Sequence, residues 1–519
     1  MHDIVLTTFN ARYAHTSLGL RYLFANLHDL QPKSHILEFV INSSVADAAE
    51  VILAHEPKVV GIGAYIWNAN EVHELVEIIK KVSPQTWVVL GGPEASHLPH
   101  RVDFSKADYI IQGEGEVAFY TLARDLLNAN PPSSRLLSPA PVDMDAITLP
   151  YAFYTDHDIA YRTCYVEASR GCPFTCEFCL SSIDKRVREI PLPRFLEALE
   201  TLWQRGVRSF KFIDRTFNLS IATATQLLDF FLAKEGEYFV HFEVIPERFP
   251  EALKARIAQF APASLQLEVG IQTLNPAIAK GIRRRLNIPK ITQNLAFLQE
   301  HTHAHLHVDL IVGLPGEDLE SFGRNLDALQ ALTQCEIQIG MLKKLSGTTL
   351  SRHDAEHGMV YADTPPYEIL QNNAISFAAM QRMKRFARFW DLAYNSGNFK
   401  KTAPLLWKEG KVFEGFSAFS QWIYAQTEST WQISLDRLAH LLLTYTCTHM
   451  GHQEETVKAL LTEDIMAVAG RKLPAFLRHM PLGNTPPKEI PQQANKRQRK
   501  HTAFLGHKDY HLFLMKRKR

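Results

Sequence analysis

Short apolar runs alternate with amphipathic stretches over the first 130 residues. The apolar runs predict five β-strands, over Ile4–Thr8, His35–Val40, Lys58–Ala64, Thr86–Leu90 and Ala107–Gln112. The stretches between them carry apolar residues at helical spacing, and they predict helices over Leu18–Leu27, Val45–His55, Glu71–Val82 and Val117–Leu127. Strands that alternate with helices indicate a parallel sheet covered on both faces, which binds ligands at the carboxyl ends of its strands. Residues 1–130 are therefore expected to form an open α/β domain.

A second alternating series begins near residue 161. Its six predicted strands are Cys164–Ala168, Ser209–Ile213, Phe239–Val244, Ser264–Val269, His305–Val312 and Glu336–Lys343, with helical patterns between them. Six βα units over residues 161–350 fit a partial barrel, whose active face lies at the carboxyl ends of the strands as in the eight-unit barrel. Residues 131–160 are rich in Pro, Ser and Asp, and they are expected to link the two domains.

The remaining third of the chain divides into a helical region and a basic tail. Residues 365–480 show no convincing strand pattern and are expected to be helical, whereas residues 481–519 are expected to be a flexible tail. Residues 484–519 hold ten Lys and Arg residues against two acidic residues, a net charge of +8 in a chain of net charge +1. The tail is expected to dock on the acidic body, and contact with an anionic partner such as RNA is the alternative.

Composition excludes several classes of protein. Apolar residues make up 46% of the 519 residues and charged residues 21%, which is typical of globular chains and not of disordered or collagen-like ones. The sequence has no apolar stretch of about 18 residues, so no membrane span is expected. The start of the chain does not have the pattern of a signal peptide. Six cysteines form no disulfide framework, and a cytoplasmic protein is expected.

Three of the six cysteines stand together on one predicted loop. Cys172, Cys176 and Cys179 directly follow the first strand of the second series, at spacings of four and three residues. Three thiolates arranged in this way can hold three irons of a 4Fe–4S cluster and leave the fourth iron open to another ligand. The alternative is zinc, but a closed zinc site needs four ligands and no neighbouring His or Cys has an ordinary spacing for the fourth.

The Cys-x-x-x-Cys-x-x-Cys motif on this loop resembles that of the radical S-adenosylmethionine (SAM) superfamily. The resemblance covers residues 161–345 and includes four further segments at successive strand ends: Phe212–Asn218, Glu268–Thr273, Asp309–Glu317 and Leu342–Thr348. It implies that the cluster cleaves SAM reductively to a 5′-deoxyadenosyl radical. It also implies SAM contacts from Phe178, Asp214, Glu268, Gln272, Gly313 and Glu317.

An α/β domain before such a barrel resembles the cobalamin-binding class of the same superfamily. The loops that carry the resemblance imply cobalamin contacts from Tyr65, Trp67, Asn68, Gly91, Gly92, Glu94, Gly113 and Gly115. The sequence has no D-x-H-x-x-G motif, so no histidine of that motif can bind cobalt, and a domain that binds nothing is the alternative. A helical extension with Tyr394-Asn395-Ser396-Gly397 resembles a subset of this class that has no assigned substrate.

The resemblance implies an enzyme that uses a 4Fe–4S cluster, SAM and cobalamin, with methyl transfer to an unidentified substrate as the leading reaction. A flavodoxin or ferredoxin would be the electron donor, and no catalytic side chain is assigned. One alternative is a radical rearrangement, cyclisation or oxidation without methyl transfer. Another is a cobalamin- or RNA-associated binding protein with a structural cluster. Methylthio transfer is disfavoured, because that family needs three further cysteines before the barrel and none precedes Cys164.

Overall fold

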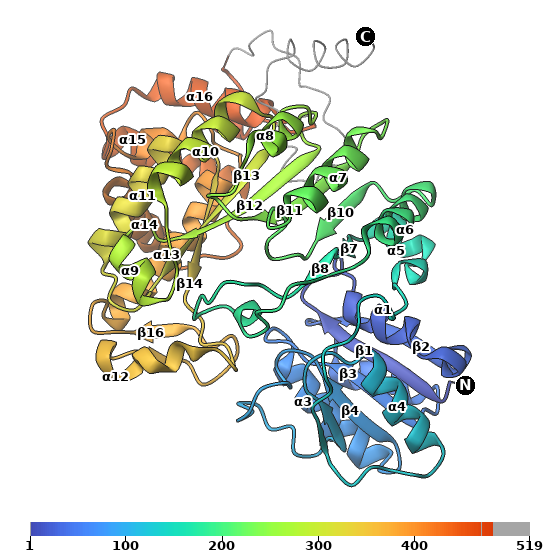
Figure 1. Ribbon diagram of the computed structural model, residues 1–519. Coiled ribbons are helices and arrows are strands. Elements are labelled where there is room, and N and C mark those ends of the chain that lie inside the picture. The colour runs from blue at the N-terminus through green and yellow to red at the C-terminus, as the bar shows by residue number, and fades with distance from the viewer. Residues whose placement is uncertain (1, 469, 481–519) are drawn as a thin grey trace. The chain divides into compact units, whose positions relative to one another are not determined.

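The computed structural model describes residues 2–468 and 470–480 (Figure 1), so the predicted basic tail lies outside the described residues. The chain divides into two compact units. Unit 1 comprises Met1–Arg215, Lys343–Ser351 and Tyr361–Glu368. Unit 2 comprises Thr216–Leu342, Arg352–Val360 and Ile369–Arg519. No helix of the described residues is both long and apolar enough to cross a membrane.

Unit 1 contains a six-stranded parallel sheet in the order β2-β1-β3-β4-β5-β6. Its strands are β1 (Ile4–Asn10), β2 (Ser34–Val40), β3 (Val59–Gly63), β4 (Trp87–Gly91), β5 (Tyr109–Ile111) and β6 (Leu136–Leu137). One face packs against α2 (Val45–Leu53) and α3 (Ala69–Val82), and the other packs against α1 (Leu18–Ala25) and α4 (Glu116–Leu127). Both faces are buried, in keeping with the burial of every residue of β1 and the wholly apolar sequence of β3, and the predicted open α/β sheet is confirmed.

The segment 131–160 is more ordered than the expected linker. It contributes β6 to the sheet, a short 3-10 helix at Tyr151–Phe153, and most of α5 (Asp156–Tyr161). Tyr151 and Tyr154 are buried, and their hydroxyls donate hydrogen bonds to the carbonyl oxygens of Glu167 and Tyr165 at 3.0 and 2.7 Å. These aromatic side chains fix a Pro-rich stretch that the composition alone assigned to a linker.

The second six-stranded sheet has the order β14-β13-β12-β11-β10-β7. Its strands are β7 (Cys164–Val166), β10 (Ser209–Phe212), β11 (Phe239–Val244), β12 (Leu265–Gln272), β13 (His305–Val312) and β14 (Glu336–Met341). Helices between them include α6 (Leu192–Gln204), α7 (Ile221–Leu232), α8 (Glu251–Ile257), α10 (Ile288–His301) and α11 (Leu319–Leu332). Along β12 and β13, buried apolar residues alternate with half-exposed, mainly polar residues. The predicted series of six βα units is confirmed.

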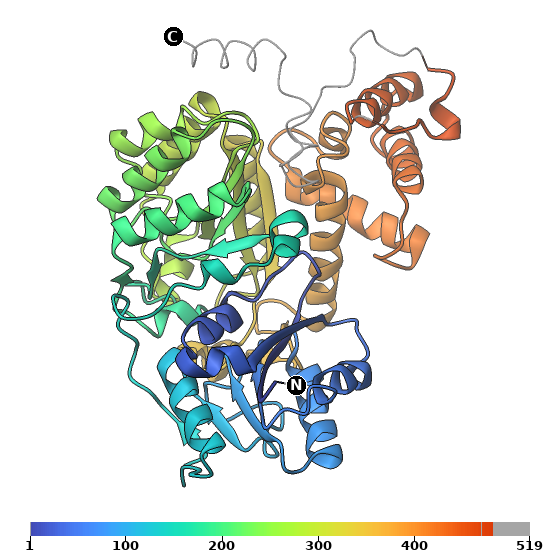
Figure 2. The same cartoon turned by 90° about the vertical axis from the view of Figure 1, so that its right-hand side faces the viewer.

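The carboxyl-terminal part of unit 2 is mainly helical, as predicted. It contains α13 (Phe377–Trp390), α14 (Val412–Thr427), α15 (Leu435–Thr448) and α16 (Glu454–Met466), together with the short strand β16 (Ile369–Gln371). Figure 2 shows these helices in orange beside the strands of the same unit. Their core is aromatic, and the Trp390 ring lies 4.9 Å from the Phe416 ring, edge to face.

The Tyr394–Gly397 motif has a structural role at the last strand of the sheet. The side-chain oxygen of Asn395 accepts a hydrogen bond from the Ile337 backbone at 2.9 Å, and its amide donates to the Ile337 carbonyl at 2.8 Å. The indole of Trp390 donates to the same carbonyl at 2.9 Å. Because β14 stands at one end of the strand order, these side chains bond to backbone groups of an edge strand.

Candidate functional site

A short antiparallel ladder closes the loop that carries the three cysteines. It pairs β8 (Ser169–Arg170) with β9 (Arg188–Glu189) and leaves residues 171–187 between them. Gly171 has a φ of 89°, and a Cβ at this position would overlap the carbonyl oxygen of Arg186. The backbone N–H of Cys172 donates to the Asp184 carbonyl at 2.8 Å. A glycine is therefore required where the loop turns back across its own end.

The three thiols of this loop are close enough to influence one another electrostatically. Cys172 and Cys176 are buried, Cys179 is half-buried, and none of the three forms a disulfide. Burial raises the pKa of Cys172, and the negative charges of Cys179 and Cys176 raise it further. Thiols this close, without a disulfide, fit the three-thiolate donor set of an open iron–sulfur cluster. The half-buried Phe178 stands directly before Cys179 in the same loop.

Asp214 supports the backbone that leads into this loop. Its buried carboxylate accepts hydrogen bonds from the Ala168 backbone at 2.9 Å and from the Ser169 hydroxyl at 2.6 Å. Burial raises the pKa of Asp214 to about 7. The resemblance implied a SAM contact for this residue, and the structure shows that the carboxylate is engaged by the residues that follow β7.

The other predicted SAM contacts lie on β12 and after β13 in unit 2. Glu268 Oε2 lies 3.0 Å from Nε2 of His241, and Glu268, His307 and Asp309 each present a ligand atom within 4.8 Å of the other two. Gln272 and Gly313 have φ values of 69° and 90°, so the backbone turns in the left-handed region at the ends of both strands. The sequence did not predict this cluster, because register across β12 and β13 brings the residues together.

Glu317 is engaged within the protein interior. Its Oε1 accepts hydrogen bonds from Thr273 at 2.7 Å, Ser321 at 3.1 Å and Asn325 at 2.8 Å. Burial raises the pKa of Glu317. The carboxylate thus joins the end of β12 to α11, a use that the sequence motif did not indicate.

A cavity of about 330 Å³ lies at the carboxyl ends of β3, β4 and β5 in unit 1. Five of the eight predicted cobalamin contacts line it: Tyr65, Gly91, Gly92, Gly113 and Gly115. A Cβ at Gly92 would lie 2.5 Å from the Ala64 carbonyl oxygen, whereas one at Gly91 would have no neighbour closer than 3.9 Å. Gly92 therefore lets the two loops approach each other, and Gly91 leaves space in the cavity.

The other three predicted contacts are placed differently. Asn68 is fully buried, and its side chain donates to Thr8 and Phe9 and accepts from the Tyr65 backbone, so it joins the ends of β1 and β3. Trp67 is 43% exposed and stacks on Tyr65 with ring centroids 4.5 Å apart. Glu94 is buried and belongs to the loop that follows β4. Of these three, only the exposed Trp67 is open to a ligand at the surface.

Buried charges on one side of the cavity were not predicted. Arg170 makes ion pairs with Glu116 at 2.7 Å and Glu167 at 2.8 Å. Burial raises the pKa of Glu167, although Arg170 opposes this. The second carboxylate oxygen of Glu116 has no hydrogen-bond partner among the residues that the structure describes. A polar ligand in the cavity could supply that partner.

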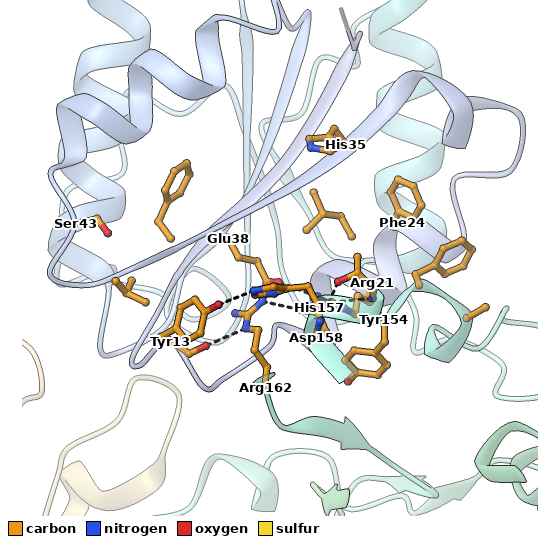
Figure 3. Close-up of a pocket in the computed structure, with 16 residues that line it drawn as sticks. Tyr13, Arg21, Phe24, His35, Glu38, Ser43, Tyr154, His157, Asp158 and Arg162 are labelled. Atoms are coloured by element: carbon orange, nitrogen blue, oxygen red, sulfur yellow. Dashed lines mark hydrogen bonds and ion pairs between the residues drawn. The ribbon is translucent and has the colours of Figure 1, made fainter. Parts of the chain in front are cut away.

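A second cavity, of about 760 Å³, lies beside β2 in unit 1 (Figure 3) and contains none of the predicted site residues. Two arginines and two acids form a closed ring of ion pairs at its floor. Arg21 pairs with Glu38 at 2.8 Å and Asp158 at 2.7 Å, and Arg162 pairs with the same acids at 2.9 and 3.0 Å. All four side chains are less than 10% exposed, so the charges compensate each other without solvent.

Three family models match consecutive parts of the chain. The B12 binding domain matches residues 4–123, the radical SAM superfamily matches residues 166–329, and a family described as a protein of unknown function, DUF4080, matches residues 355–517. Among curated proteins, one named an uncharacterized methyltransferase, from Pyrococcus horikoshii, is 28% identical over 39% of this chain and 49% of its own length. The cobalamin-dependent radical SAM methyltransferase TokK of Streptomyces tokunonensis is 26% identical over 53% of this chain and 45% of its own. The chain thus spans about half the length of these relatives.

Two solved structures have a similar fold. The cobalamin-dependent SAM radical enzyme OxsB, with aqua-cobalamin and SAM bound, gives a TM-score of 0.58 at 12% identity, over 89% of this chain and 78% of that chain. The radical SAM methyltransferase TsrM from Kitasatospora setae, with cobalamin and a 4Fe–4S cluster bound, gives 0.55 at 18% identity, over 70% and 78%.

The fold, the cysteine loop and the family matches define a radical SAM protein with an amino-terminal B12-binding domain. Its carboxyl-terminal third adds the DUF4080 region, which includes the helices α13–α16.

Proposed function

We propose that the chain is a cobalamin-dependent radical SAM enzyme that transfers a methyl group to an unidentified substrate. One observation carries the proposal. The loop with three free thiols and the glycine-lined cavity at the ends of β3, β4 and β5 belong to the same compact unit. The methyltransferase names of the matched relatives support methyl transfer in preference to the other radical reactions.

In this proposal Cys172, Cys176 and Cys179 are the protein ligands of a 4Fe–4S cluster. When bound, the cluster, SAM and cobalamin would supply the electron, the radical and the methyl group. The β8–β9 ladder holds the thiolates together, and Asp214 fixes the backbone that enters the loop. Phe178, Glu268, Gln272 and Gly313 remain the proposed SAM contacts, and the buried Glu317 would act by holding the end of β12.

The cavity of unit 1 would hold part of cobalamin. Gly91 and Gly113 leave room for close backbone approach, because a Cβ would meet nothing within 3.8 Å at either position. The second carboxylate oxygen of Glu116 offers an acceptor for an amide or hydroxyl of the cofactor, while Arg170 fixes the first. Tyr65 and Trp67 present stacked rings at the end of β3, and in this proposal they would contact cobalamin, with no histidine from a D-x-H-x-x-G motif.

Anaerobic reconstitution with iron, sulfide, hydroxocobalamin, SAM and a reductant tests the proposal. Mass spectrometry should detect both 5′-deoxyadenosine and S-adenosylhomocysteine, the first from radical cleavage of SAM and the second from methyl transfer to cobalamin. Cleavage without S-adenosylhomocysteine, at any cobalamin concentration, would favour a radical reaction without methyl transfer. Absence of both products from a chain that retains about four irons would refute the enzyme function.

We further propose that a flavodoxin or ferredoxin supplies the electron in a reducing cytoplasm. The three clustered cysteines support this, because such a cluster in a reducing compartment more often binds metal than forms disulfides. Replacing a chemical reductant with flavodoxin and its reductase should sustain 5′-deoxyadenosine formation.

A further inference from the structure

The loop after β4 receives a side chain from a distant part of the sequence. Tyr367 belongs to the 361–368 segment of unit 1, and its hydroxyl donates a hydrogen bond to Oε1 of Glu94 at 2.5 Å. The two residues are 273 positions apart in the chain, and their exposed fractions are 0% and 5%. A charge-assisted bond that is buried on both sides is among the stronger hydrogen bonds in a protein.

Other contacts hold the same segment in place. The Arg101 guanidinium lies over the Tyr367 ring at 4.3 Å from its centroid, and the Lys344 backbone donates to the Tyr367 carbonyl at 3.1 Å. Gly347 approaches the same loop at a second point, where a Cβ would lie 2.5 Å from the His97 ring. The 343–351 and 361–368 segments therefore contact the loop at two places, Glu94 and His97.

This loop is tied to the strand ends that border the glycine-lined cavity. The Glu94 backbone donates to the Ala64 carbonyl after β3 at 3.2 Å. The Ser96 hydroxyl donates to Gly92 at 2.8 Å and accepts from the Gly113 backbone after β5 at 3.0 Å. A displacement of Glu94 would thus reach Gly92 and Gly113, both of which line the cavity.

We infer that Tyr367 is a positioning residue that holds the Gly92–His97 loop in the conformation that binds cobalamin, an inference that rests on the proposed function. Tyr367 acts through Glu94 and is not among the residues that line the cavity. The position lies inside the DUF4080 match, which begins at residue 355. The start of that region thereby completes the B12-binding domain of the same chain.

The pKa of Tyr367 agrees with a phenol that donates its hydrogen bond to the Glu94 carboxylate. Burial, and then the Glu94 carboxylate, raise the pKa of Tyr367 above its ordinary value. The phenol is therefore held as the donor and the carboxylate as the acceptor. The left-handed backbone of Tyr367, with a φ of 56°, further shows that the surrounding contacts fix this residue.

The test compares Tyr367→Phe with Tyr161→Phe in the full chain. Tyr161 is 70% exposed at the end of α5, so its variant controls for loss of a phenol hydroxyl as such. Hydrogen exchange of the Glu94–Ser96 amides is measured first without cobalamin. Exchange should be about tenfold faster in Tyr367→Phe and unchanged in Tyr161→Phe, because only the first loses a bond to this loop. Equal exchange in Tyr367→Phe and the wild type would overturn the inference.

Spectroscopic titration with hydroxocobalamin then gives the dissociation constant of each variant. Tyr367→Phe should bind about tenfold more weakly, and the Glu94→Gln, Tyr367→Phe double variant should bind no more weakly than the weaker single variant. Faster exchange with an unchanged dissociation constant would refute the role in cobalamin binding, and additive losses would refute action through Glu94. If the wild type binds no cobalamin, the proposed function and the cobalamin role both fail, while the exchange result still decides whether Tyr367 holds the loop.

Discussion

Arg188 makes a two-pronged ion pair with Glu114, with donor–acceptor distances of 2.6 and 3.0 Å. Arg188 lies in the ladder that closes the cysteine loop, and Glu114 lines the glycine-lined cavity. Burial alone would raise the pKa of Glu114. Arg188 and then Arg170 outweigh burial and lower this pKa, which keeps the carboxylate charged. This pair joins the backbone of the proposed cluster site to the wall of the proposed cobalamin site.

Arg188→Met should destabilise unit 1, because it leaves Glu114 half-buried without its main partner. The free energy of unfolding is expected to fall by about 2–4 kcal/mol, near the lower part of the range for broken buried ion pairs. Glu114→Gln, combined with Arg188→Met, should cost less than the sum of the two single changes, and thermal unfolding of all four proteins measures this coupling. Additive effects would show that the pair contributes little. Arg188→Lys should recover part of the loss, since Lys cannot match the two-pronged geometry.

Cys176→Ala should abolish cluster assembly after anaerobic reconstitution. The loop would then present two thiolates, too few to hold three irons. Iron content should fall from about four per chain to near zero, with loss of the broad visible absorbance. Cys447→Ala is the control, because Cys447 lies on α15, outside the loop. A Cys176→Ala chain that retains about four irons would contradict the assigned ligands.

Gly91→Val should block cobalamin without unfolding the protein. A Cβ at Gly91 meets no atom closer than 3.9 Å and the residue does not need a positive φ, so the new side chain is tolerated and enters the cavity. The hydroxocobalamin dissociation constant should rise at least about tenfold, with Gly91→Ala intermediate, at an unchanged melting temperature. Gly281→Ala, which also adds a Cβ in open space, serves as the control. Wild-type affinity in Gly91→Val would place cobalamin elsewhere.

The ion-pair ring beside β2 predicts a pH dependence of stability. Burial opposes ionisation of Asp158, yet the Arg21 guanidinium outweighs it and lowers the pKa to about 2. A carboxyl with a depressed folded pKa stabilises the protein above its unfolded pKa of about 3.9, and this contribution is lost as pH falls through the folded value. Asp158→Asn should therefore lower stability by about 2 kcal/mol at pH 7, and the difference from the wild type should shrink from pH 4 towards pH 2.

Thermal unfolding between pH 7 and pH 3 checks this prediction. Asp156→Asn is the matched control, since Asp156 lies on the same helix with a fully exposed side chain. The control should leave the melting temperature within about a degree of the wild type. A gap between Asp158→Asn and the wild type that stays constant down to pH 3 would contradict the assigned ion-pair contribution.

The fold and the cysteine loop could be predicted because their signals are local. The mainly apolar segments of β1 and β3 and the alternation of apolar and mainly polar residues along β12 and β13 are visible in the sequence, and three cysteines within eight residues need no tertiary information. Whether an individual polar residue contacts a ligand or supports the fold could not be predicted in the same way. Asn68 and Glu317 stand in loop motifs that suggest ligand contact, but the structure buries both in hydrogen bonds to neighbouring elements.

The missed residues depend on pairs that are distant in sequence. Arg21 meets Asp158 across 137 residues, and Tyr367 meets Glu94 across 273. No periodicity or spacing in one sequence reports such contacts. The order within 131–160 depends on similar contacts, since Tyr151 and Tyr154 bond to the backbone of Glu167 and Tyr165.

The hydrogen bonds from Asn395 to Ile337 bear on how this protein can be shortened for study. The Asn395 amide and the Trp390 indole form hydrogen bonds with backbone groups of β14 that could otherwise pair with another strand. A recombinant fragment that stops before α13 would leave that strand uncovered, and bare strand edges recruit other chains and precipitate. The helical region thus also covers the edge of the second sheet, so the region that matches the radical SAM superfamily and the DUF4080 region should be expressed as one piece.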